Sequence, residues 1–426
     1  MTMRMTKCSI IAAATLALAS SVAHADVTLS VLIDTNPETI ASFDAVSKAY
    51  SEKNPDVTFD VEQRAGGSEG DNIVKTRLAT GEMPDVFQYN SGSLFKALKP
   101  EQTMADLSDL PSAAGILESF KKVVSGADGH VRGIPFGPAM GGGIFYNRKI
   151  YAELGLQPPK TWAEFIANNE KVKAAGKVAI AQTYGTTWTS QIFVLADFFN
   201  VQTEVPTFAD DYTANKVKYA TTPAALRGFE HQEEVAKAGF FNEDFGAATF
   251  DDGMRMVSTG EAAHYPSLTF GIGNIQQNFP DNVQDVGFFA EPGTDAAKNG
   301  LTIWMPAALY LSAKAEHLEE AKKFLDFVAS KEGCELMAKA VPSGPYLIKG
   351  CELPKDVPQA VTDMLPYFQT EGRNGPALEF LSPVKGPALE QITVEVGTGI
   401  RSAKDAAALY DQDVAKQAKQ LGLPNW

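Results

Sequence analysis

From about residue 27 onward, the hydrophobic and polar residues follow two alternating periodicities. An apolar run at 27–33 predicts a strand, and the amphipathic spacing at 39–54 predicts a helix. The same succession continues with a strand at 57–63, a helix at 71–80 and a strand at 84–89. Strands that alternate with helices at this spacing favour an α/β fold with a mostly parallel sheet covered on both faces.

Polar residues gather in the loops that follow these predicted strands. In open parallel sheets, ligands bind beyond the carboxyl ends of the strands, because the loops converge there and helix N-termini point free N–H groups at the site. The loops therefore supply candidate ligand contacts, namely Thr35, Asn36, Glu38, Arg64, Ser68, Glu69, Asn90 and Ser91.

A glycine- and proline-rich stretch at 133–143 interrupts the pattern, and a strand resumes at 144–147. A chain of this length is too long for a single core, so we interpret the interruption as a crossing between two lobes. We expect a second crossing within the apolar strand at 302–312 and a third near Tyr367. The expected division is a first lobe of residues 26–136 plus 312–362 and a second lobe of residues 137–311 plus 363–426.

The first 25 residues have the three parts of a signal peptide. Arg4 and Lys7 precede an apolar stretch at 10–22, and the small residues Ala23 and Ala25 suit a signal peptidase. The apolar stretch is shorter than the roughly 20 residues that span a bilayer. We therefore expect cleavage after Ala25 and a soluble protein in the periplasm.

Acidic residues outnumber basic residues by 52 to 37, which gives a formal net charge of −15. Removal of Arg4 and Lys7 with the signal peptide would take this charge to −17. A chain this acidic is unsuited to nucleic acid as a partner.

Three cysteines are present, and cleavage of the signal peptide would remove Cys8. Cys334 and Cys351 would remain as an even pair in an oxidising compartment. A disulfide between them would stabilise the fold by roughly 3 kcal/mol in the chain-entropy model. Two free buried thiols are the alternative, which the sequence leaves open.

A specific motif lies in the first half of the chain. It consists of residues 134–136 (IPF), 144–149 (IFYNRK), 154–156 (LGL) and 158–165 (PPKTWAEF). Thr161 and Glu164 also have the spacing of a helix capping box. The motif resembles the family 1 extracellular solute-binding proteins of ABC importers, which include maltose-binding and glycerol-3-phosphate-binding proteins.

This resemblance implies a two-lobed periplasmic-binding-protein fold with discontinuous lobes joined by a multi-strand hinge. It implies a monomer that has no catalytic activity and no cofactor, and that delivers its solute to membrane permease subunits. Carried over position by position, the family's ligand contacts fall on Thr35 or Asn36, Trp188, Ser267 and Phe270. The late stacking tryptophan of some members has no equivalent at 380–386, which argues against a maltose-like ligand.

A sugar offers apolar C–H faces and a rim of hydroxyls, so its site needs flat aromatic surfaces and hydrogen-bonding groups. The candidate surfaces are Trp188, Tyr265, Phe270 and Trp304. The candidate polar groups are Asn36, Glu38, Arg64, Asn90, Ser91 and Ser267. Trp304 fits the core equally well, because its strand is otherwise apolar. Trp162 is expected in the core, since it lies in the first turn of an amphipathic helix.

Enzymatic alternatives find little support in the residues. Residues 66–70 match the Gly-x-Ser-x-Gly nucleophile elbow, but no Asp and His pair stands out downstream. The histidines are scattered without metal-ligand spacing, so no metal site is expected. The sequence therefore predicts a carbohydrate-binding importer component. A binding protein for glycerol phosphate or another polyol is the alternative within the family, and a secreted carbohydrate-active enzyme is the alternative from another class.

Overall fold

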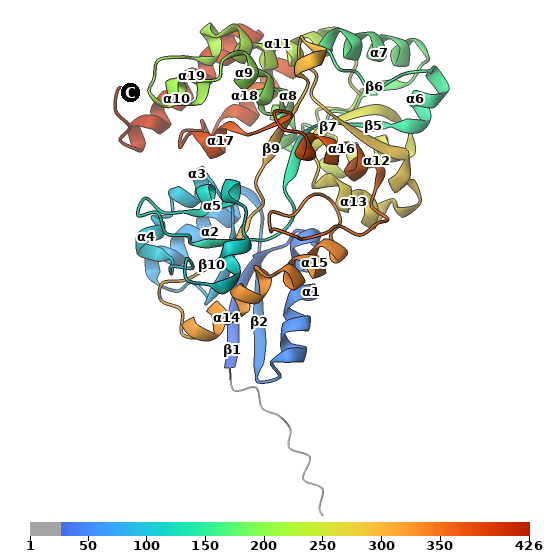
Figure 1. Cartoon of the computed structure of the whole chain (residues 1–426). Helices are drawn as coiled ribbons and strands as arrows, with labels where there is room; N and C mark the ends of the chain where they lie inside the picture. The colour runs from blue at the N-terminus through green and yellow to red at the C-terminus, as the bar shows by residue number, and fades with distance from the viewer. Residues whose placement is uncertain (1–26) are drawn as a thin grey trace, which may run out of the picture.

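Two β-sheets organise the chain into two lobes (Figure 1). The computed structural model describes residues 27–426, so the expected signal peptide lies outside the described residues. In the described part of the chain, no helix combines the length and the apolar character needed to cross a membrane.

The first lobe is built on a five-stranded sheet with the order β2-β1-β3-β10-β4. Its elements are β1 (Val27–Asp34), α1 (Pro37–Lys53), β2 (Val57–Arg64), α2 (Gly67–Thr80), β3 (Val86–Tyr89), α3 (Ser93–Lys96), α4 (Pro100–Thr103), α5 (Glu118–Val124), β4 (Gly133–Pro135), β10 (Ala308–Leu311), α14 (Leu318–Val328) and α15 (Lys331–Ala340). β1 pairs in parallel with β2 and β3, whereas β10 runs antiparallel to β3 and β4. The strands and helices expected before residue 90 are all present, although α2 begins four residues earlier than predicted.

The second lobe is built on a sheet with the order β11-β9-β5-β7-β6, to which β8 adds by pairing with β5. Its strands are β5 (Met140–Asn147), β6 (Val178–Ile180), β7 (Ala262–Leu268), β8 (Val286–Ala290), β9 (Leu301–Trp304) and β11 (Asn374–Pro376). Its helices are α6 (Arg148–Leu154), α7 (Trp162–Ala174), α8 (Ile192–Ala196), α9 (Phe198–Glu204), α10 (Phe208–Thr213), α11 (Pro223–Lys237), α12 (Phe250–Thr259), α13 (Gly271–Asn278), α16 (Gln359–Gln369), α17 (Leu378–Leu381), α18 (Leu389–Gly397) and α19 (Ala403–Gln420).

The prediction of a mostly parallel sheet is wrong for this second lobe. β5 runs antiparallel to β7, β8 and β9, and only the β6–β7 and β9–β11 pairs are parallel. The prediction came from residues 27–89, where α1 and α2 return the chain between parallel strands. β5 instead enters from the other lobe.

Two of the expected lobe boundaries need correction. The apolar run at 302–312 is not one strand, because β9 belongs to the second sheet and β10 to the first. Residues 308–311 were expected in the second lobe, and their pairing with β3 and β4 places them in the first. α16 packs against β8, so the boundary expected at residue 362 falls inside a helix of the second lobe.

Local sequence signals explain several element boundaries. Asn36 caps α1, with its side chain accepting a hydrogen bond from the Glu38 backbone N–H. The predicted capping box at the start of α7 is confirmed, because Thr161 accepts from the N–H of Glu164 and the Glu164 carboxylate accepts from the N–H of Thr161. Trp162 is buried, as expected for a core residue.

A disulfide joins Cys334 of α15 to Cys351, with 5.9 Å between the two Cα atoms. Cys334 belongs to the hydrophobic core of the first lobe, and Cys351 packs against that core. The bond therefore ties α15 to the segment that leaves the first lobe for α16.

Candidate functional site

The carboxyl ends of β1, β2 and β3 lie at one edge of the first sheet, because these three strands are parallel. Figure 1 shows this edge turned toward the second lobe. Thr35, Asn36 and Asn90 follow β1 and β3 there, and all three are exposed. This edge of the sheet therefore exposes polar side chains that the sequence predicted in the loops after the strands.

Arg64 and Ser91 lie at the same edge but already have protein partners. Arg64 is 5% exposed, and its Nη2 donates to the carbonyl oxygen of Gln88 at 3.1 Å and to its side-chain oxygen at 3.0 Å. The Ser91 hydroxyl donates to the carbonyl oxygen of Pro306 at 2.9 Å. These side chains therefore hold the loops of the edge in place, and Ser91 also ties the edge to the crossing between β9 and β10.

Glu38 reaches from α1 to the second lobe. A Cβ atom at Gly273 of α13 would overlap its carboxyl group, so the two lobes are in close contact here. The Oε1 atom of Glu38 is buried and has no hydrogen-bond partner among the described residues. Burial raises the pKa of Glu38 to about 8, although the nearby Ser343 hydroxyl and Gly273 backbone oppose this shift.

Three aromatic side chains form a cluster on the second lobe, which we call the aromatic cluster: Trp188, Phe250 and Phe270. The ring centroid of Trp188 lies 5.4 Å from that of Phe250 and 5.5 Å from that of Phe270. Phe250 and Phe270 stack on each other at 5.3 Å. All three are only partly buried, so the cluster offers a flat apolar surface of the kind that packs against the C–H face of a sugar.

Local structure positions each member of the aromatic cluster. Trp188 lies in the short 3-10 helix Thr187–Gln191, and Phe250 is the first residue of α12 after a capping box formed by Thr249 and Asp252. Phe270 immediately precedes α13. Because Gly273 of α13 is also the residue that Glu38 touches, the aromatic cluster lies close to the contact between the lobes.

Tyr265 is a core residue, and the prediction that it offers a ligand surface is wrong. It is fully buried in β7, and its hydroxyl is 2.8 Å from that of Thr183. A Cβ atom at Gly253 of α12 would overlap its ring, which shows how closely that helix covers it. Ser267 of the same strand is also fully buried, and its hydroxyl oxygen has no partner among the described residues.

Trp304 is 6% exposed and lines a cavity of about 20 Å³ between β9 and the C-terminal segment. Glu379 and Lys385 line the same cavity, and the Lys385 Nζ atom lies 3.2 Å from the Glu379 Oε2 atom. A cavity of this size holds little more than a water molecule. Trp304 therefore packs mainly as a core residue in this structure.

Sequence reasoning missed three residues of this region: Phe250, Gly273 and Ser343. Phe250 had a usable signal, because a large aromatic residue directly after the capping threonine Thr249 begins a helix near a sheet edge. Gly273 and Ser343 had none, since each matters only through its contact with Glu38 from a distant part of the chain.

Comparison with known proteins identifies the family. The sequence pattern of the bacterial extracellular solute-binding proteins matches residues 35–333. The chain is 24% identical over 331 residues to the multiple sugar-binding protein of Streptococcus mutans, covering 75% of this chain and 74% of that protein. It is also 24% identical over 396 residues to the sn-glycerol-3-phosphate-binding periplasmic protein UgpB of Shigella flexneri, covering 84% and 83%.

Solved structures share the fold across nearly the whole chain. A chitin oligosaccharide binding protein superposes with a TM-score of 0.78 at 20% identity, covering 92% of this chain and 99% of that chain. The binding protein RafE in complex with raffinose superposes with a TM-score of 0.76 at 20% identity, covering 93% and 99%. Together with the match to the family pattern, these observations establish that the chain belongs to the bacterial extracellular solute-binding proteins, a family of binding proteins rather than of enzymes.

Proposed function

We propose that this protein is the periplasmic component of an ABC importer and that it captures a sugar or an oligosaccharide between its two lobes. The aromatic cluster carries this proposal, because it lies on the second lobe beside the helix that Glu38 of the first lobe touches. An apolar surface from one lobe and polar groups from the other match the two kinds of surface on a sugar.

The first lobe would supply the hydrogen bonds to the sugar hydroxyls. Thr35, Asn36 and Asn90 are exposed at its edge, and Glu38 brings a carboxyl group to the contact between the lobes. The S. mutans relative is named for multiple sugars and the RafE structure contains raffinose, which supports an oligosaccharide as the ligand.

Glycerol phosphate is the second candidate, and the relationship to UgpB favours it. A phosphate group needs positive partners. The Arg64 guanidinium at the sheet edge is already hydrogen-bonded to Gln88 and lies over the Tyr89 ring. The Glu38 carboxyl group at the contact between the lobes supplies no positive charge, so we favour a neutral sugar over an anion.

Capture would follow from movement between the lobes. The chain crosses between the sheets at 136–139 and at 305–307, and a third time before α16, which begins at Gln359. A ligand that touches both lobes stabilises the closed form, and conversion from mostly open to mostly closed takes roughly 5.5 kcal/mol of differential binding. We further propose that residues 1–25 direct export to the periplasm and are removed, and that the monomer delivers its ligand to the permease.

A thermal-shift screen tests the proposal. Raffinose, chitin oligosaccharides, simple hexoses and glycerol 3-phosphate should be added separately to the purified protein, and at least one sugar should raise the melting temperature. A response to glycerol 3-phosphate alone would favour the second candidate. A protein that responds to none of the sugars would contradict the carbohydrate proposal, and new reducing ends in the incubated oligosaccharides would indicate an enzyme.

A further inference from the structure

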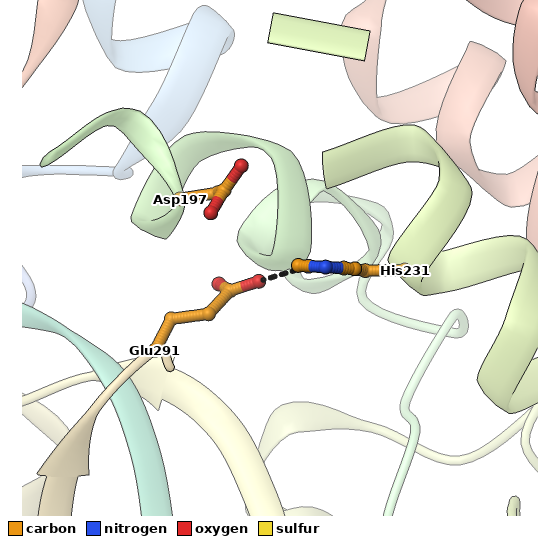
Figure 2. A group of neighbouring side chains, drawn as sticks. All are labelled: Asp197, His231 and Glu291. Atoms are coloured by element: carbon orange, nitrogen blue, oxygen red, sulfur yellow. Dashed lines mark hydrogen bonds and ion pairs between the residues drawn. The ribbon is translucent and has the colours of Figure 1, made fainter. Parts of the chain in front are cut away.

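Two carboxyl groups and an imidazole meet inside the second lobe. Asp197 joins α8 to α9, His231 lies on α11, and Glu291 directly follows β8. One ligand atom from each residue lies within 4.8 Å of the other two. Figure 2 shows all three side chains directed toward a common space. We call these three residues the buried triad.

The buried triad is closed off from solvent and incompletely hydrogen-bonded. Asp197 and Glu291 are each 1% exposed, and His231 is 4% exposed. Within the triad, 3.5 Å separates His231 Nδ1 from Glu291 Oε1, which is long for a hydrogen bond. Asp197 Oδ2 and Glu291 Oε2 have no hydrogen-bond partner among the described residues. Buried carboxyl oxygens without partners are costly, so these two atoms point to a missing ligand.

Neighbouring side chains hold the triad in place. The Asn200 side-chain amide donates to Asp197 Oδ1 at 2.7 Å and to the carbonyl oxygen of Glu291 at 3.3 Å. The Trp162 ring stacks on the His231 ring at 3.6 Å, with only 7° between their planes. The Trp162 indole N–H in turn donates to Glu234 at 2.7 Å. Supporting contacts of this kind orient the ligands of metal sites in proteins.

The charge of the triad also suits a cation. Neither Asp197 nor Glu291 forms an ion pair with a lysine or an arginine among the described residues. Arg227 is close enough to influence both Asp197 and His231, but its guanidinium pairs with Glu204 at 2.5 Å. Burial raises the pKa of both triad carboxyl groups, to about 7 for Asp197. A bound dication would offset the cost of ionising them.

We propose that Asp197, His231 and Glu291 bind one divalent transition-metal ion, and that zinc suits this site best. One imidazole nitrogen and two carboxylate oxygens are ligands that zinc commonly takes, whereas an imidazole is foreign to the all-oxygen sites of calcium and magnesium. The ion would be structural, because no member of the triad reaches solvent. It would join α11, the α8–α9 junction and the end of β8.

Metal analysis of the purified protein tests this proposal. The protein should be stripped with a chelator, incubated with zinc, desalted and analysed for bound metal, and its melting temperature should be recorded with and without zinc. We expect one zinc ion per chain and a rise of about 5 °C or more, since a ligand that binds only the folded state stabilises it. The variants Asp197→Asn and Glu291→Gln should lose both effects.

Glu234→Gln is the matched control, because it removes a nearby carboxylate that is not a member of the triad and leaves an acceptor for Trp162. This variant should keep the bound zinc. Absence of bound zinc in the wild-type protein would overturn the proposal. Zinc binding by Asp197→Asn and Glu291→Gln that equals wild-type binding would also overturn it. If one of these variants fails to fold, the other variant and the metal content of the wild-type protein decide the question.

Discussion

The two lobes meet across one boundary but are stabilised by different means. The first lobe has a single hydrophobic core and a disulfide, Cys334–Cys351. The second lobe contains three hydrophobic clusters and no cysteine in residues 137–304 or 359–426. The buried triad lies in this second lobe. A metal ion bound there would cross-link separate elements of the second lobe, as the disulfide cross-links two segments of the first.

The surfaces that the lobes turn toward each other differ as well. The first lobe presents exposed polar side chains and the Glu38 carboxyl group, while the second presents the aromatic cluster. Aromatic area contributes affinity through burial, whereas a carboxyl group that is buried only on closure makes closure sensitive to its surroundings. We therefore expect the second lobe to determine much of the affinity and Glu38 to determine much of the response to pH.

Removal of the disulfide should have the largest effect on stability. In the double variant Cys334→Ser and Cys351→Ser, the unfolded chain regains the freedom that the bond removes, which costs about 3 kcal/mol for a loop of this length. Chemical denaturation should show this loss. Ligand affinity at low temperature should change little, because Cys334 lies in the core of the first lobe and Cys351 packs against that core. A loss of affinity of about the same free energy would show that the disulfide of the first lobe also affects ligand binding.

Loss of the central aromatic side chain should have the largest effect on binding. Trp188→Ala removes the ring that contacts both Phe250 and Phe270, and we expect affinity for the sugar to fall by about 50-fold. Calorimetric titration would measure the loss. Trp426→Ala is a suitable control, because that ring is also partly buried but packs against Tyr212 and Lys218. Unchanged affinity in Trp188→Ala would remove this residue from the site.

Local patterns predicted the parts of the fold that local interactions determine. β1, α1, β2 and β3 follow from alternating periodicities, and the Thr161–Glu164 capping box follows from a spacing of three residues. The division of the apolar run at 302–312 between two sheets was harder to predict, because apolar residues predominate throughout the run. The break between β9 and β10 includes Pro306, which has no backbone N–H to contribute to a sheet.

The site was only partly predictable, because burial depends on partners that are distant in the sequence. Trp188 and Tyr265 were both predicted as aromatic surfaces, yet Gly253 of α12 lies against the Tyr265 ring and nothing near Tyr265 in the sequence indicates this. The buried triad shows the same limit more strongly. Its three members lie on separate elements, and no spacing between them matches a known metal motif.

A methyl group at the contact between the lobes should weaken binding moderately. In Gly273→Ala, the new Cβ atom would overlap the Glu38 carboxyl, so full closure would require this side chain to move. We expect about a tenfold loss of sugar affinity with an unchanged melting temperature of the ligand-free protein. In the Glu38→Ala background, the same Gly273→Ala substitution should cost little further affinity, because the carboxyl group that it overlaps is absent. An equal loss in that background would place the cause elsewhere in α13.

The smallest predicted effect is a dependence of closure on pH. Glu38 has a pKa of about 8 where it is buried against α13, whereas exposure in an open form would return it toward its ordinary value of 4.5. The closed form therefore holds a proton that the open form releases, so closure is favoured at low pH and weakens as pH rises from about 4.5 to 8.

Glu38 as a whole is partly exposed, so we expect a modest loss of sugar affinity, about fivefold between pH 5.5 and 7.5. The radius of gyration of the ligand-free protein should increase over the same range in small-angle X-ray scattering. Glu38→Gln cannot ionise and should bind with nearly the same affinity at both values. If the pH profile of Glu38→Gln instead matched that of the wild-type protein, the titrating group would lie elsewhere. The polar surface of the first lobe would then not be the source of the pH dependence of closure.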